Sequence, residues 1–193
     1  MPRISMFGAF FFKMDVALLG YYLKSGKSEE HGIRRRFRSV SLCSFAIKSK
    51  TIMIRKIETA DYPRLVEIWE SAVRHTHDFL AEEDVLYYKE RLPSYFPHVA
   101  LRGFEQDGNL VGFIGVHGDN IEMLFVHNDY RGKGIGKRLV LHAMRELHVC
   151  KVDVNEQNAQ AAGFYERMGF RTRAKSALDN EGKPYPILHM QIS

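Results

Sequence analysis

The chain contains the segment Tyr130-Arg131-Gly132-Lys133-Gly134-Ile135-Gly136 between an apolar run at 121–126 and an amphipathic run that continues to Leu147. A glycine-rich turn between a strand and a helix presents unpaired N–H groups and the positive end of the helix dipole. Glycine also lets the backbone approach an anion closely and adopt positive φ. Lys133 and Lys137 add positive charge. The segment, called the phosphate loop below, therefore predicts a site for a phosphate compound.

The spacing of the glycines excludes two phosphate-binding motifs. The chain has no G-x-x-x-x-G-K-[ST] string, which a P-loop requires. A dinucleotide fingerprint, G-x-G-x-x-G, also fails, because Lys137 stands where the third glycine is needed. An oxidoreductase that uses the loop for a dinucleotide is therefore excluded. What remains is Arg131-x-x-Gly134-x-Gly136, for which a plain helix start is the alternative interpretation.

A second block follows the phosphate loop. Residues 152–155 are typical of a short strand, and Asn158 precedes the run Phe164-Tyr165-Glu166-Arg167-Met168-Gly169-Phe170. Asn158 can cap a helix, and Gly169 can end it in the left-handed conformation. The block is therefore explicable as helix punctuation when it is taken alone.

Taken together, the two blocks resemble the GNAT N-acetyltransferase superfamily, whose R/Q-x-x-G-x-G/A loop binds the pyrophosphate of coenzyme A and precedes an N-x-x-A-x-x-x-Y-x-x-x-G-F block. The resemblance covers residues 54–192 and is closest to small bacterial proteins of the YjaB kind, which share the strings at 76–80, 154–158 and 182–186. It implies acetyl-CoA as acetyl donor, with no metal. It also implies an α/β fold of the mixed α+β type, in which helices flank a mixed central β-sheet and a splayed strand pair holds acetyl-CoA.

The resemblance also implies which residues bind the cofactor. In the family, pantetheine lies in the gap beside the strand before the loop, and a strand N–H can face the thioester oxygen. We expect the cofactor to contact this strand, the phosphate loop and the next strand and helix start, at Leu124, Phe125, Val126, Arg131, Gly132, Lys133, Gly134, Ile135, Gly136, Lys137, Asn155 and Asn158. Tyr165 matches the tyrosine that protonates the departing sulfur, and its alternative role is core packing.

The general base is less directly indicated. Glu122 shares a strand face with Leu124 and Val126 by alternation, and we take it as the catalytic base. The best-known glutamate of the family matches the position of Asn120, two residues earlier. His117 could act directly or through water, or be a half-exposed turn residue.

The resemblance implies that the segment after the first predicted helix lines the acceptor site. It contributes His77 and Asp78, and His117 is the third predicted acceptor-binding residue. His75, His77 and Asp78 do not form a metal site, because no further ligand lies nearby with zinc-like spacing.

The charge is divided unevenly along the 193 residues. Residues 1–52 hold 10 Lys and Arg against 3 Asp and Glu, whereas the remainder holds 18 against 20. The second part is therefore slightly acidic, and no nucleic-acid partner is expected. Two cysteines are too few for a disulfide framework, which fits the cytoplasm.

The chain divides into an N-terminal extension at 1–52 and a GNAT domain at 53–193, which begins at Met53. The extension is expected to be poorly ordered, or to be upstream sequence translated by a start-site choice. An amphipathic helix on a membrane surface is the alternative for it. No membrane span is expected, because charged residues interrupt the apolar run at 6–22.

The elements predicted for the domain alternate as β-α-α-β-β-β-α-β-α-β-β. Strands are expected at 54–57, 98–105, 110–116, 121–126, 151–154, 170–175 and 187–191. A helix capped by Thr59 or Asp61 carries Pro63 in its first turn, and further helices are expected at 83–91, 134–147 and 159–168. The second of these helices is expected to end before Pro93.

The resemblance to the GNAT superfamily implies an N-acetyltransferase that transfers acetyl from acetyl-CoA to an amine by direct attack. A non-catalytic acyl-CoA-binding or regulatory module is the alternative, because the predicted base does not align with the family glutamate. The acceptor is either a small-molecule amine or a protein amine, and the protein is expected to be a monomer or a homodimer.

Overall fold

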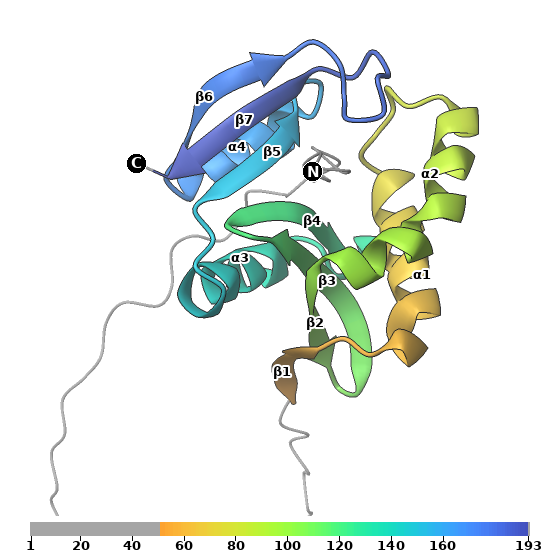
Figure 1. The fold of residues 1–193 in the computed structure, drawn as a ribbon. Coiled ribbons are helices and arrows are strands. Elements are labelled where there is room, and N and C mark those ends of the chain that lie inside the picture. Colours follow the sequence, from red (N-terminus) through yellow and green to blue (C-terminus); the bar gives the residue numbers. More distant parts are fainter. Residues whose placement is uncertain (1–50, 193) are drawn as a thin grey trace, which may run out of the picture.

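The computed structural model describes residues 51–192 (Figure 1). Of the extension predicted at 1–52, residues 1–50 lie outside the described residues, and only Thr51 and Ile52 are described. The elements are β1 (Ile52–Lys56), α1 (Tyr62–Val73), α2 (Glu82–Tyr95), β2 (Ala100–Gln106), β3 (Asn109–His117), β4 (Asn120–Val126), α3 (Ile135–Glu146), β5 (Lys151–Asn155), α4 (Ala159–Arg167), β6 (Phe170–Ser176) and β7 (Ile187–Ile192). Short 3₁₀ helices occur at η1 (Thr59–Asp61), η2 (Phe96–His98) and η3 (Asn128–Tyr130). The predicted order of helices and strands is confirmed.

The strands form one seven-stranded mixed sheet in the order β1-β2-β3-β4-β5-β7-β6. All neighbouring pairs are antiparallel except β4 and β5, which are parallel. Figure 1 shows α1 and α2 on one side of β2–β4, α3 on the other side, and α4 beside β5. The predicted mixed α/β architecture is confirmed. Within 51–192, no helix combines the length and apolar character needed to cross a bilayer.

The core lies between α1 and the central strands. Leu65, Ile68 and Trp69, which recur at helical spacing, are fully buried in α1. The Trp69 ring meets the Phe125 ring of β4 edge-on at 6.3 Å, and Phe125 packs against Phe113 of β3 at 5.2 Å. This aromatic packing fixes α1 on the strand that leads into the phosphate loop.

The predicted end of the second helix is wrong. The helix was expected to stop before Pro93, but α2 runs from Glu82 to Tyr95 and contains it. Proline removes one backbone hydrogen bond and crowds the preceding turn. Leu92 and Tyr95 are buried on either side of it, so packing against the core offsets this cost.

Two local predictions have different outcomes. The turn at 106–109 is confirmed as a tight hairpin between β2 and β3, with positive φ at Asp107 (53°) and Gly108 (79°). Pro63 does lie in the first turn of α1, but Asp61 makes no side-chain capping bond to that helix. The Asp61 carboxylate instead accepts hydrogen bonds from Arg55 and from the backbone N–H of Glu58.

The sheet is interrupted at its centre. The ladder between β4 and β5 has two residue pairs, Asn120 with Lys151 and Ile121 with Val152. Both strands continue beyond these pairs, β4 to Val126 and β5 to Asn155, without further ladder pairing to each other. The strands therefore separate toward the end of β4 that leads into the phosphate loop.

The first strand begins close to the N-terminal end of the described residues. Ile52 pairs with Gln106, and Thr51 exchanges hydrogen bonds with Asp107, so pairing begins before Met53. A chain that begins at Thr51 is expected to unfold cooperatively on heating. A chain that begins at Met53 should fold but lose roughly 1–2 kcal/mol of unfolding free energy with these hydrogen bonds. Thermal denaturation followed by circular dichroism measures both, and loss of cooperative unfolding in the Thr51 chain would contradict the domain boundary.

Candidate active site

A narrow crevice lies where β4 and β5 separate. It is lined by four residues of β4, three residues of β5 and one of α4, which are Ile121, Glu122, Met123, Leu124, Val152, Asp153, Val154 and Tyr165. Most of these side chains are apolar, and Glu122, Asp153 and Tyr165 supply the polar groups. The crevice therefore combines a dry environment with a few groups that can exchange protons.

Glu122 is the extra residue of a β-bulge. Gly115 pairs with Met123 and Val116 pairs with Ile121, so Glu122 on β4 has no opposite residue on β3. Strict alternation along β4, on which its predicted face was based, is interrupted at this point. A bulge re-aims side chains locally, and Glu122 lines both the crevice and a second, polar groove.

The Glu122 carboxyl is buried and only partly hydrogen-bonded. The residue is 6% exposed, and its Oε1 accepts a hydrogen bond of 2.8 Å from Asn120 Nδ2. Its Oε2 is buried with no hydrogen-bond partner among the described residues. Burial raises the pKa of Glu122 to about 6, and the negative charge of Asp153 adds to this effect. Glu122 is therefore a stronger base than an exposed glutamate.

The polar groove continues from the crevice and has a volume of about 570 Å³. Glu122 and Asp153 line both, so the crevice and the groove meet at these two carboxyl groups. Further polar residues line the groove from β3, β4, β6 and β7, and include His117, Asn120, Arg173 and His189. A polar molecule in the groove would therefore lie next to the Glu122 carboxyl.

The phosphate loop has the geometry that its glycines predict. Gly132 and Gly134 adopt positive φ of 74° and 75°. Apart from the adjacent residues, no atom of residues 51–192 lies within 4 Å of the place where a Cβ would stand at either glycine. Gly134 is the N-cap of α3, so the first N–H groups of that helix begin directly after it. The loop is thus open to an anion.

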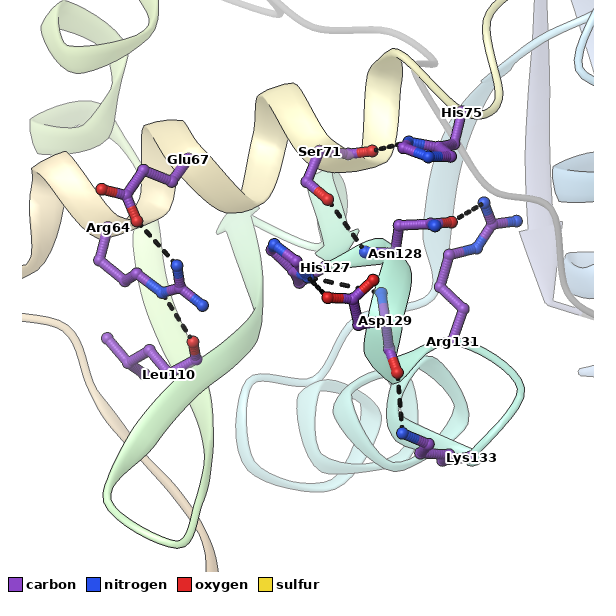
Figure 2. A network of polar contacts seen from close by, with 10 residues as sticks. All are labelled: Arg64, Glu67, Ser71, His75, Leu110, His127, Asn128, Asp129, Arg131 and Lys133. Carbon is purple, nitrogen blue, oxygen red and sulfur yellow. Dashed lines mark hydrogen bonds and ion pairs between the residues drawn. The ribbon is translucent and has the colours of Figure 1, made fainter.

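The entrance to the phosphate loop is tied to α1 (Figure 2). The Asn128 N–H donates to Ser71 Oγ at 3.2 Å, and Arg131 donates to Asn128 Oδ1 at 3.4 Å. Burial lowers the pKa of Arg131 to about 10, which leaves it charged at neutral pH. Lys133 is exposed, donates to the Asp129 carbonyl at 2.8 Å and lies over the Tyr130 ring. Arg131 and Lys133 therefore place positive charge at the loop.

Of the predicted residues of β5 and α4, Tyr165 lines the crevice, whereas Asn155 ends β5 and Asn158 precedes α4. Asn158 accepts from the Ala161 N–H and so caps α4, while its buried Nδ2 has no hydrogen-bond partner within 51–192. Asn155 Oδ1 accepts from the Gln157 N–H, and its Nδ2 is also buried without a hydrogen-bond partner among the described residues. Tyr165 is 2% exposed, and burial raises the pKa of its phenol well above 10. The phenol therefore stays protonated at neutral pH.

The three predicted acceptor-binding residues do not lie together in the structure. His117 lines the polar groove close to Glu122, and its positive form would lower the pKa of that carboxyl. His77 is buried, and burial lowers its pKa to about 3 with a smaller contribution from Arg131. Asp78 is exposed beside it, in the connection between α1 and α2. Neither His77 nor Asp78 is among the residues that line the groove.

Two residues of the site were not predicted from the sequence. Asp153 and His189 line the groove and form a hydrogen-bonded pair, with Nδ1 of His189 2.6 Å from Oδ1 of Asp153. They are 36 residues apart in the chain and meet only because β5 pairs with β7. In the sequence, only the position of Asp153 between two apolar valines of a short strand indicated that it lies in a site.

The chain matches a known domain family. Residues 70–192 match the family described as Acetyltransferase (GNAT) domain. The chain is 39% identical to the peptidyl-lysine N-acetyltransferase YjaB of Salmonella typhimurium over 140 residues, which covers 72% of this chain and 97% of the relative. It is 37% identical to the YjaB protein of Escherichia coli over 72% of this chain and 95% of that protein.

Solved structures resemble the fold. The solution structure of the apo form of Escherichia coli YjaB matches with a TM-score of 0.68 and 37% identity, over 73% of this chain and 97% of that chain. The paiA N-acetyltransferase of Thermoplasma acidophilum, solved in complex with coenzyme A, matches with a TM-score of 0.58 and 22% identity, over 74% and 99% of the two chains. The second likeness concerns the fold alone.

The buried Glu122 should destabilise the fold when it is charged. Burial raises the pKa of Glu122 to about 6 in the folded protein, above its value in the unfolded chain. The unfolding free energy should therefore fall as the pH rises from the unfolded-state pKa through the folded-state pKa. Glu122→Gln should therefore increase the unfolding free energy by up to about 2 kcal/mol at about pH 8, and by nothing below about pH 4. Urea denaturation across this range measures the difference.

The matched control for this measurement is Glu146→Gln, at an exposed position of α3. It should show no comparable gain that grows with pH. A pH-independent effect of Glu122→Gln would mean that the carboxyl is not held in a desolvated site.

Proposed function

The chain belongs to the GNAT acetyltransferase family, and from this premise we propose that it transfers an acetyl group from acetyl-CoA directly to a lysine amine of a protein. The observation that carries this proposal is the pairing of a buried base, Glu122, with a protonated phenol, Tyr165, along one crevice. The enzyme is an acyltransferase of the N-acetyltransferase kind. Its donor, mechanism and acceptor are the proposed parts.

The residues present fit coenzyme A as the donor carrier. Gly132 and Gly134 leave open space above the loop backbone, and the helix start and Arg131 supply positive potential for a pyrophosphate. The unpaired Nδ2 groups of Asn155 and Asn158 are donors that a cofactor can use. When bound, acetyl-CoA supplies an acetyl group activated as a thioester.

Glu122 is the proposed proton acceptor. An alkylamine with a pKa near 10.4 arrives as an ammonium ion and must lose a proton before it can attack. Glu122 lines both the groove and the crevice, its buried Oε2 has no hydrogen-bond partner among the described residues, and Asn120 donates to Oε1. Burial raises the pKa of the carboxyl to about 6, which brings it closer to that of the amine.

Tyr165 is the proposed proton donor. Its phenol is buried across the crevice from β4, between Phe164 and Phe170, whose rings contact it edge-on. These rings fix its position and exclude water. Tyr165 holds a proton at its oxygen and can give it to a leaving group that becomes negative in the crevice.

The relatives favour lysine in a protein as the acceptor. Both YjaB proteins carry the name peptidyl-lysine N-acetyltransferase and align over 95% or more of their own length. The polar groove is open to solvent along residues of several strands, which suits a long side chain that enters from outside. Incubation of the purified protein with acetyl-CoA and lysine peptides, followed by mass spectrometry, tests the activity. Acetylation restricted to free amino acids would overturn this choice of acceptor.

The phosphate loop should bind coenzyme A through its backbone. Gly134→Val adds a branched side chain at a residue with φ of 75°, in space that the cofactor needs. We expect calorimetry to show coenzyme A affinity reduced by about 100-fold or more. Lys133→Ala should cost less than about tenfold, because its charge is exposed and screened.

Gly108→Val is the control for backbone strain. Gly108 has φ of 79° and equally open space, but it lies in the hairpin between β2 and β3. It should lose stability in the same way and keep its affinity for coenzyme A. Normal affinity in folded Gly134→Val would remove the loop from the binding site.

Tyr165→Phe should separate binding from chemistry. The ring keeps its contacts with Phe164 and Phe170, so the fold and the affinity for acetyl-CoA should change little. Loss of the proton donor should lower single-turnover transfer by about 10²–10⁴-fold. An unchanged transfer rate would show that Tyr165 serves only in packing.

A further inference from the structure

Three polar side chains from neighbouring strands form a chain behind the groove. Asp153 of β5 stands opposite His189 of β7 in their ladder. His189 Nδ1 lies 2.6 Å from Asp153 Oδ1, and His189 Nε2 lies 2.7 Å from Ser176 Oγ at the end of β6. Because a carboxylate oxygen only accepts, His189 Nδ1 donates to Asp153, and Nε2 shares the second hydrogen bond with the Ser176 hydroxyl. The Asp153 carboxyl is therefore held in one orientation.

The other oxygen of Asp153 faces the proposed base. Asp153 Oδ2 lies 3.5 Å from Asn120 Nδ2, and the same Nδ2 donates to Glu122 Oε1 at 2.8 Å. One amide group thus stands between the two carboxyls. Both carboxyls line the groove and the crevice, and the Asp153 side chain is 13% exposed. This is the place at which a molecule in the groove meets the base.

The other charged groups of the groove leave this place negative. Asp119 is paired with Lys151 at 2.8 Å, so these two charges offset each other. His117 Nδ1 donates to the His98 carbonyl at 3.2 Å. Among the described residues that line the groove, Arg173 of β6 adds a further positive charge. Glu122 and Asp153 share one desolvated junction, where their potential is least screened.

We propose that Asp153, oriented by His189 and Ser176, binds the ammonium group of the acceptor beside Glu122. The inference rests on the proposed function, because it assigns the acceptor subsite of the same transfer. The ammonium donates one N–H to Asp153, which keeps the nitrogen in place. Glu122 takes another proton, which leaves the amine neutral with a lone pair for attack. The subsite selects cationic alkylamines over uncharged groups of the same shape.

Ser176 is a positioning residue in this arrangement. Serine, histidine and aspartate also form hydrolytic triads, in which the serine oxygen must reach the reacting carbonyl. Ser176 is absent from the residues that line the crevice and the groove, whereas Asp153 lines both. In the hydrogen-bonded series Ser176–His189–Asp153, the Asp153 carboxylate therefore lies at the groove and the Ser176 hydroxyl does not.

The test compares two ligands of the same length, one ending in a charged ammonium group and the other in an uncharged hydroxyl group. Nα-acetyl-lysine amide and Nα-acetyl-6-hydroxynorleucine amide are titrated into the full-length protein with excess coenzyme A, and binding is followed by NMR. The wild-type protein should prefer the amine by about 10- to 100-fold, the range for a hydrogen bond to a charged group. Asp153→Asn, which keeps an acceptor for His189, should reduce this preference to about threefold or less.

Asp119→Asn is the matched control, because Asp119 lines the same groove but is paired with Lys151. It should keep the preference. Asp153→Ser repeats the test with a smaller side chain if the asparagine variant does not fold. A wild-type protein without charge preference, or a preference that survives in both Asp153 variants, overturns the assignment.

A second readout separates this inference from the proposed function. The same samples are supplied with acetyl-CoA, and product is measured by mass spectrometry. If the preference for the amine depends on Asp153 but no acetylated product forms, the proposed transfer is overturned and the subsite is supported. Acetylated product with equal KM for the amine in wild type and Asp153→Asn supports the transfer and overturns the subsite.

Discussion

The short parallel ladder between β4 and β5 is the constraint on which the rest of the site depends. Two residue pairs hold the strands together at one end, and beyond Ile121 and Val152 they part. A buried sheet normally pairs its backbone groups continuously. Here the opening is kept because each strand is anchored on its far side, β4 by β3 and β5 by β7. The sheet can therefore hold a crevice in its centre without losing its outer pairing.

The same desolvation acts on both groups proposed for proton transfer. Burial raises the pKa of Glu122 to about 6 and raises that of Tyr165 well above its usual range. One group becomes a better base, and the other stays protonated. The bulge at Glu122 brings this carboxyl to the crevice, and Asn120 prevents a larger pKa shift by donating to it. The environment of each group thus favours the role proposed for it.

The wall beyond the groove is built from elements that are distant in the chain. The connection between β6 and β7 is fastened to α2 by polar contacts. Tyr88 donates to Asp179 at 2.6 Å, Tyr87 and Tyr95 donate to Glu181, and Asp84 accepts from Lys183 and Tyr185. The Phe79 ring packs 6.3 Å from the Tyr185 ring. The strings at 76–80 and 182–186, which stood apart in the sequence, therefore lie against each other.

Local sequence was sufficient for the order of the elements and for the phosphate loop. Gly132, Gly134 and the cap residue Asn158 act through backbone conformation within a few residues, so their spacing predicts their structure. The sequence also indicated Glu122 and Tyr165, although simple alternation does not hold across the bulge at Glu122. It was wrong at Pro93, because burial of Leu92 and Tyr95 is not a local property.

Only the tertiary structure decided which polar residues share the groove. Asp153, His189 and Ser176 meet through strand pairing across long separations, and no local pattern encodes a register between β5, β7 and β6. The raised pKa of Glu122 likewise depends on neighbours from other strands. Short-range conformational preferences thus determined the loop and the element order, whereas the desolvation and charge that give the site its chemistry required the folded chain.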